Sequence, residues 1–116
     1  MQIQIKRAYS PVAAEDGLRI LVDRLWPRGM KKEDAKIDFW PKDITPSTAL
    51  RQAYHQELIG WEEFREKYLR ELEQYPETLA ELRSLAQQHK LSLITAAKNE
   101  TQNHAVVLQA LLQHTA

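Results

Sequence analysis

The sequence predicts a small α/β layer fold, with a short parallel or mixed sheet of about three strands covered by about five helices. Three short apolar segments have the composition of strands, at residues 2–6, 18–25 and 91–97. Helical apolar spacing fills the chain between the second and third segments and after the third. Strands that alternate with helices are typical of parallel sheets. The length of 116 residues predicts a single domain, residues 1–116.

The sequence patterns of the first two strand segments predict different degrees of burial. Residues 2–6 alternate polar and apolar, with Ile3 and Ile5 on one face, which is typical of a half-buried strand. Residues 18–25 contain three consecutive large aliphatic side chains, so we expect a central strand covered on both faces. About ten residues without a helical pattern join these two segments, which is the lower limit for a parallel crossover. The first strand is therefore expected to be either parallel or antiparallel.

The helix with the clearest pattern covers residues 61–72. Its apolar side chains recur at intervals of three and four residues, and charged side chains occupy the other face. The apolar positions are Trp61, Phe64, Tyr68 and Leu72. This stripe is expected to face the core.

Three other helices have recognisable starts. Thr45-Pro46 indicates an N-cap followed by proline at the first helical position, and Pro76 begins a further helix. The last helix follows Lys98, with Asn99 or Thr101 as the expected cap.

The composition limits the classes of function. Sixteen basic residues balance sixteen acidic ones, so no overall field attracts nucleic acid or an anionic membrane. The chain has no cysteine, which excludes disulfides and thiolate chemistry. Its four histidines lack metal-ligand spacing, and no glycine-rich phosphate loop is present. We expect no metal and no cofactor.

The amino-terminal segment and the hydropathy pattern predict a cytoplasmic protein. The chain does not begin with a charged start followed by an apolar run, and it has no apolar stretch of membrane-spanning length. We expect no association with a membrane. Unpaired strand edges and apolar helix faces would allow a dimer, but the sequence does not fix the oligomeric state.

Polar residues follow the second and third strands. Ligands of open α/β sheets bind beyond the carboxyl ends of the strands, and the ends of parallel neighbours meet at one edge. The second strand leads into D-R-L-W-P-R-G, and the third leads into the segment that starts the last helix. The candidate site residues are Asp23, Arg24, Trp26, Arg28, Lys98, Asn103 and His104.

These side chains predict a site for an anion. Arginine, lysine and a helix amino terminus all bind phosphate or carboxylate, so Arg24, Trp26, Arg28, Lys98 and Asn103 are the expected ligand-binding residues. The expected catalytic residues, if the protein is an enzyme, are Asp23 and His104. Either could accept a proton, and Asp23 could instead orient an arginine or bind a sugar hydroxyl.

Each candidate also has a structural interpretation. Arg24 and Arg28 could form ion pairs with Asp23 or with the acidic residues 33–34. Trp26 could fill a hydrophobic gap, and His104 could cap its helix or be solvated. These alternatives stay open from the residues alone.

Four segments of the chain resemble a known family. They are DGLRILVDRLWPRGMKKEDA, TPSTALRQAYH, WEEFREKYLRELE and LITAAKNETQNHAVVLQALL. Together they resemble the YeaO-like branch of the bacterial domain-of-unknown-function family 488, from about Lys6 to Leu112. The resemblance implies a small α/β domain with a parallel sheet and no established activity. It also places Cys-His-Arg of the wider family at Asn103-His104-Ala105, where only the histidine is retained, so thiolate chemistry is not expected.

Two functions are compatible with these observations. The first is a pocket for a small anionic ligand, such as a phosphate ester or nucleotide, which would support hydrolysis or group transfer if the protein is catalytic. The second is an interaction module whose Arg-Trp-Pro-Arg-Gly loop binds a protein or nucleic-acid partner, since tryptophan and arginine commonly anchor interfaces.

Overall fold

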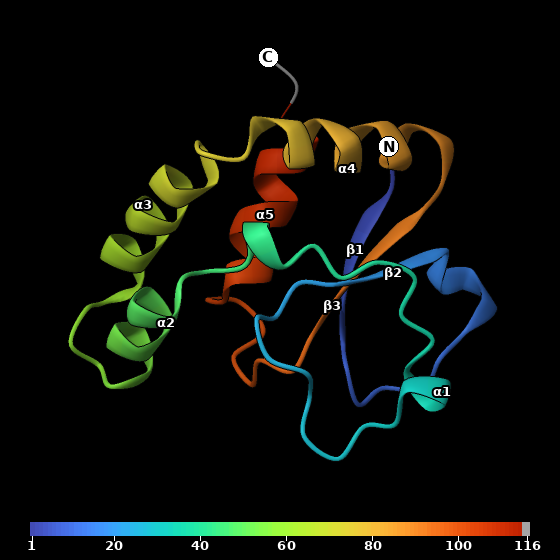
Figure 1. Cartoon of the computed structure of the whole chain (residues 1–116), viewed down its shortest axis with the longest axis horizontal. Helices are drawn as coiled ribbons and strands as arrows, with labels where there is room; N and C mark the ends of the chain where they lie inside the picture. Colours follow the sequence, from blue (N-terminus) through green and yellow to red (C-terminus); the bar gives the residue numbers. More distant parts are fainter. Residues whose placement is uncertain (115–116) are drawn as a thin grey trace.

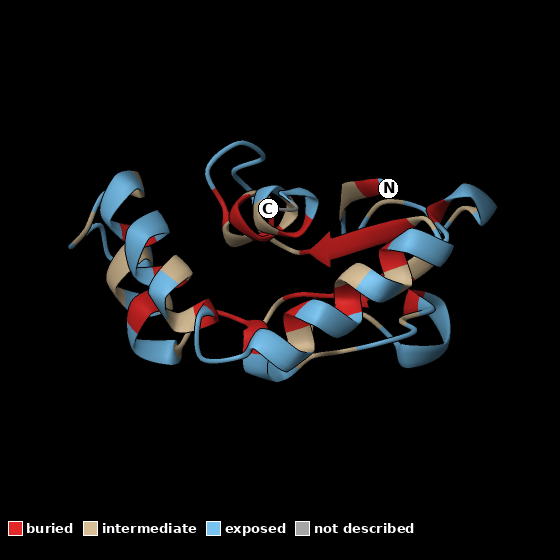
Figure 2. Cartoon of the chain, turned by 90° about the horizontal axis from the view of Figure 1, so that it is seen from above, coloured by how far each residue is buried: buried red, intermediate tan, exposed pale blue. Residues whose placement is uncertain are grey.

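A computed structural model describes residues 1–114 and contains one parallel sheet of three strands (Figure 1). The strands are β1 (Ile3–Arg7), β2 (Leu18–Leu21) and β3 (Leu91–Thr95), in the order β1-β3-β2. The α/β class is confirmed, and the first strand is parallel to its neighbour. The prediction that the second strand is central is wrong. That place belongs to β3, which is buried along its whole length (Figure 2).

The segment between β1 and β2 explains how so short a connection joins parallel strands. Because β3 lies between them, the chain crosses one face of the sheet instead of forming a neighbouring βαβ unit. It makes one 3-10 turn, η1 (Ala14–Asp16), and enters β2 through Gly17. Gly17 has φ 66° and lies against the backbone of Lys90, where a side chain would collide with the carbonyl oxygen.

Four helices form the main core with one face of the sheet. They are α2 (Thr48–His55), α3 (Trp61–Leu72), α4 (Pro76–Gln88) and α5 (His104–Gln113), and α5 is the one that packs directly on the strands. In Figure 1, α5 lies beside the sheet, and α3 and α4 pack against α5. The predicted stripe of α3 faces this core, since Phe64, Tyr68 and Leu72 are buried and Trp61 is partly buried.

A long irregular segment covers the other face. It includes the short helix α1 (Lys32–Ala35) and precedes the 3-10 turn η2 (Lys42–Ile44). Leu21 and Ile94 pack there against Trp26 and Trp40. Phe39 also forms a parallel bridge with Ile20 on the outer side of β2. This cover confirms that the second strand is buried on both faces, although it is not the central one.

Several boundaries differ from the predictions, including that of the first strand, which covers Ile3–Arg7 and not residues 2–6. β2 ends at Leu21 and β3 ends at Thr95, because the chain then turns to place side chains at the carboxyl edge. The cap of α2 is Ser47, whose hydroxyl accepts a hydrogen bond from the Leu50 N–H. Thr45 is not that cap, because it closes the turn η2, where its hydroxyl donates to the Lys42 carbonyl, and the helix begins only at Thr48.

The last helix also has a different cap from the one predicted. Asn103, not Asn99 or Thr101, accepts a hydrogen bond from the Val106 N–H at 3.0 Å. The Asn99 side chain accepts hydrogen bonds from the N–H groups of Thr101 and Gln102 and forms a turn before the helix. Lys98 and Asn99 therefore lie on a loop, and α5 begins at His104.

A buried polar cluster ties the crossing segment to the sheet. The Asp16 carboxylate accepts hydrogen bonds from Lys6 Nζ at 2.7 Å and from Arg19 Nη1 at 2.6 Å. The Ser92 hydroxyl donates to the Asp16 carbonyl. Burial disfavours the charged form of Asp16, but Lys6, the Ala13 N–H and Arg19 outweigh it and lower its pKa to about 2.

Within residues 1–114, no helix combines the length and apolarity needed to cross a membrane.

Candidate functional site

Asp23 and His104 meet at the carboxyl edge of the sheet. Asp23 follows β2, and its Oδ1 lies 2.8 Å from Nε2 of His104, the first residue of α5. The same carboxylate accepts hydrogen bonds from the Thr95 hydroxyl at 2.7 Å and from the Ala96 N–H at 2.8 Å. Asp23 thus joins the ends of β2 and β3 to the start of α5.

The charge of Asp23 is stabilised by these partners. Burial of the carboxyl opposes ionisation, but the hydrogen bond and charge of His104, the Ala96 N–H and the Thr95 hydroxyl outweigh it. They hold the pKa of Asp23 below its ordinary value of 3.8. The carboxylate is therefore an acceptor at neutral pH.

Two of the predicted ligand-binding residues contact the protein itself. The Arg24 guanidinium donates to the carbonyl of Pro46 at 2.9 Å and to that of Thr45 at 3.3 Å, so it holds the segment before α2. Trp26 donates from Nε1 to the Met30 carbonyl at 2.6 Å and packs edge-on against Trp40.

Asn103 is likewise held by protein contacts, at the start of α5. Besides capping the helix, its amide donates to the Asn99 carbonyl at 2.7 Å and is buried. This pair of bonds fixes the loop of residues 96–103 relative to the helix.

Arg28 and Lys98 are exposed at the same edge. Among the described residues neither forms an ion pair, so the alternative in which Arg28 pairs with Asp23 or residues 33–34 does not hold. The Tyr9 hydroxyl donates to the Arg28 carbonyl at 3.0 Å, which brings the chain after β1 next to the D-R-L-W-P-R-G loop.

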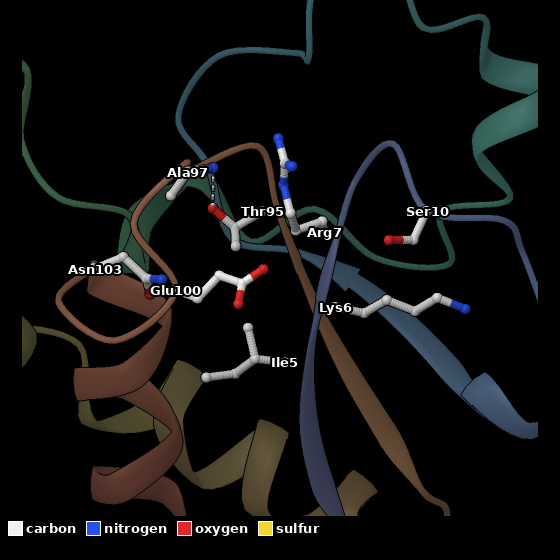
Figure 3. Close-up of a pocket in the computed structure, with 8 residues that line it drawn as sticks. All are labelled: Ile5, Lys6, Arg7, Ser10, Thr95, Ala97, Glu100 and Asn103. Atoms are coloured by element: carbon white, nitrogen blue, oxygen red, sulfur yellow. Dashed lines mark hydrogen bonds between the residues drawn. The ribbon is translucent and has the colours of Figure 1, made fainter.

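A cavity of about 400 Å³ opens at the carboxyl ends of β1 and β3 (Figure 3). Polar and charged side chains predominate in its lining. The lining residues are Ile5, Lys6, Arg7, Ser10, Thr95, Ala97, Glu100 and Asn103. Asp23 and His104 do not line the cavity. Thr95 connects the cavity to this pair, because it is a lining residue and its hydroxyl donates a hydrogen bond to Asp23.

Sequence reasoning missed Arg7, Ser10 and Glu100 as candidate residues. The signal that could have found Arg7 is its place as the last residue of β1. With the direction of that strand open, its carboxyl end could not be assigned to the same edge as those of β2 and β3. The parallel register, in which Arg7 lies beside Thr95, removes this ambiguity.

Replacing Asp23 with asparagine is expected to lower the free energy of unfolding at pH 7 by about 2 kcal/mol. An amide keeps the shape but loses the charge and one acceptor: its NH₂ group must replace either the oxygen that accepts from the Ala96 N–H or the oxygen shared by the Thr95 hydroxyl and His104 Nε2. Because the folded pKa of Asp23 is lowered, its contribution is present above pH 3.8 and is lost as the pH falls below that value. Urea denaturation of both forms at pH 7 and pH 3 measures the difference.

Thr95→Val is the matched control, since it removes the hydroxyl that donates to Asp23 and accepts from the Ala97 N–H, and it should cost about 1 kcal/mol. Equal stability of Asp23→Asn and the wild-type protein at pH 7 would contradict a structural contribution from this carboxylate.

Fold and site together define a small parallel α/β protein with a polar cavity at the carboxyl edge of its sheet. A family model described as "Inactive DUF488-N3 subclade" matches residues 2–116. The chain therefore belongs to the DUF488 family, in its YeaO-like branch.

Two relatives illustrate the similarity. "Uncharacterized protein YeaO" of Escherichia coli K12 is 54% identical over 108 residues, covering 93% of this chain and 94% of the relative. "Uncharacterized protein Rv3073c" of Mycobacterium tuberculosis H37Rv is 38% identical over 111 residues, covering 96% of this chain and 93% of the relative. The comparison with solved structures found no match.

Proposed function

We propose that this protein is a binding domain that holds a small anionic ligand at the carboxyl edge of its sheet. The observation that carries the proposal is the cavity of about 400 Å³ at the ends of β1 and β3, with Arg7 on its wall. Its volume is within the range of small-molecule sites. Its position, beyond the carboxyl ends of parallel strands, is where open α/β sheets bind ligands.

The distribution of cations supports an anionic ligand. Arg7 ends β1, Arg28 follows β2 and Lys98 follows β3. In the part of the chain that the structure describes, all three are exposed and none forms an ion pair. None of these three cations has a carboxylate partner in that part of the chain, although Glu100 also lines the cavity and the net charge of the chain is zero.

The other candidate residues then have positioning roles. Asp23 and His104 hold the loop of residues 96–103 between the sheet and α5, and Asn103 caps that helix. Arg24 and Trp26 fix the chain after β2. Binding without catalysis agrees with the word "Inactive" in the description of the matched subclade.

A second candidate function is proton transfer by the Asp23–His104 pair. Its supporting observation is the contact of His104 Nε2 with Asp23, the arrangement that orients a histidine as a general base. The pair lies outside the cavity lining, so we place binding first. Turnover of p-nitrophenyl phosphate that is lost in His104→Gln would favour catalysis.

Replacing Arg7 with glutamine is expected to weaken binding of inorganic phosphate or ethyl phosphate about tenfold, because a charge-assisted hydrogen bond is lost. Isothermal titration calorimetry measures this change. Arg70→Gln is the matched control, since Arg70 is an exposed arginine on α3 that does not line the cavity.

Equal affinities of the wild-type protein and Arg7→Gln for these phosphates would sink the proposal. Failure of every small anion to bind would also contradict the proposal. In that case, a protein or nucleic-acid partner that binds the wild-type protein but not Arg28→Gln would favour the alternative in which the Arg-Trp-Pro-Arg-Gly loop is an interaction module.

A further inference from the structure

We infer that the ligand carries an amine as well as an anionic group, so that Glu100 binds its positive end and Arg7 its negative end. This inference rests on the proposed function and narrows its ligand class. It starts from the two opposite charges on the wall of one cavity.

Glu100 is the acidic residue that a site for a simple anion would not need. It lies on the loop of residues 96–103, and Figure 3 shows its carboxylate pointing into the space between Ile5 and Thr95. At this position it would repel a phosphate or carboxylate bound in the cavity. An amine on the ligand removes that repulsion and turns it into attraction.

The two charges do not neutralise each other. In the described part of the chain neither Arg7 nor Glu100 forms an ion pair, although both line the same cavity. In Figure 3 the guanidinium of Arg7 extends away from the Glu100 carboxylate. Both groups are exposed, and each is free to contact a ligand.

The rest of the lining suits a short bipolar molecule. Ile5 and Ala97 supply apolar surface for a carbon chain, and Ser10 supplies a hydroxyl. The shared chemistry is therefore an amine joined by a short carbon chain to an anion. The anion could be a carboxylate, as in an amino acid, or a phosphate, as in an amino alcohol phosphate.

Two pairs of probes test the inference and separate these sources. Phosphoethanolamine is compared with ethyl phosphate, and β-alanine with propionate, so that each pair differs by the amine. We expect the wild-type protein to bind the amine-bearing member of at least one pair about fivefold more tightly, the upper range for an exposed charge pair. The pair with the greater affinity identifies the anion. Titrations followed by ¹H–¹⁵N correlation spectra detect the weak binding expected of such small ligands.

Glu100→Gln is the decisive variant, because it keeps the size of the side chain and removes its charge. It should abolish the preference for the amine while leaving ethyl phosphate bound as tightly as, or more tightly than, in the wild-type protein. Glu66→Gln, at an exposed position on α3, is the matched control and should leave the preference unchanged.

The outcomes distinguish this inference from the proposed function. Binding of ethyl phosphate without any preference for the amine, or a preference that survives in Glu100→Gln, overturns the inference and leaves anion binding standing. Failure of all four probes to bind overturns both.

Discussion

Replacing Asp16 with asparagine is expected to lower the free energy of unfolding at pH 7 by about 3 kcal/mol. The carboxylate is buried between Lys6 and Arg19, and the Arg19 side chain is itself only 3% exposed. Removing one member of a buried ion pair leaves the other charge uncompensated. Arg19 is especially sensitive, because its buried Nη2 has no hydrogen-bond partner within residues 1–114 and its Nη1 would lose the negative charge of its partner.

The pH dependence of Asp16→Asn provides an independent signature. The pKa of Asp16 is about 2 in the folded protein and 3.8 ordinarily, so its contribution to stability is fully present above pH 3.8. It is lost as the pH falls from 3.8 toward 2. The wild-type protein should therefore lose stability in this window more steeply than Asp16→Asn.

Urea denaturation across the acid range measures both effects. Lys6→Gln is the control, because it removes the more exposed partner, 18% exposed, and leaves Asp16 paired with Arg19, so the cost should be about 1 kcal/mol. An equal loss in the free energy of unfolding for Asp16→Asn and Lys6→Gln would contradict the claim that the uncompensated charge of buried Arg19 is the main destabilising effect.

Replacing Gly17 with alanine is also expected to cost about 3 kcal/mol. Gly17 has φ 66° and ψ −137°, a conformation almost confined to glycine. In addition, a Cβ atom would collide with the backbone carbonyl of Lys90, which accepts a hydrogen bond from the Leu18 N–H. Both the turn into β2 and the register of β2 on β3 would have to shift.

Gly29→Ala separates these two costs. Gly29 also has a positive φ, 79°, but nothing lies within 4 Å of its Cβ position. This variant carries only the conformational strain and should cost about 1 kcal/mol. Thermal unfolding of the two variants gives the comparison, and equal melting temperatures would rule out the close approach at Lys90 as the larger effect.

Local patterns were sufficient to predict most of the elements. Apolar spacing places α3 at residues 61–72, and composition places strands near residues 3, 18 and 91. The order of the strands could not be predicted, because nothing local in Leu18–Leu21 distinguishes a central strand from an edge strand that Phe39 and a long loop cover. Strand order depends on pairing between distant segments.

The candidate site was predictable to a similar extent. The carboxyl-edge rule brings Asp23 and His104 together, at 2.8 Å, because β2 and β3 are parallel neighbours. The same rule could not show that Arg24 and Trp26 bond to nearby carbonyls, since such contacts depend on the path of an irregular loop. Arg7 and Glu100 were missed because the cavity lies at the carboxyl end of β1, and the sequence did not show at which edge of the sheet that end lies.

The most direct test of the central claim, anion binding at the carboxyl edge, is a map of where inorganic phosphate binds. In ¹H–¹⁵N correlation spectra of the full chain, the proposal predicts that phosphate shifts backbone amides of residues 7–10 and 95–103 most strongly. The same titration of Arg7→Gln should show these shifts weakened. Shifts confined to α3 and α4, or shifts at the carboxyl edge that persist undiminished in Arg7→Gln, would contradict the proposed site.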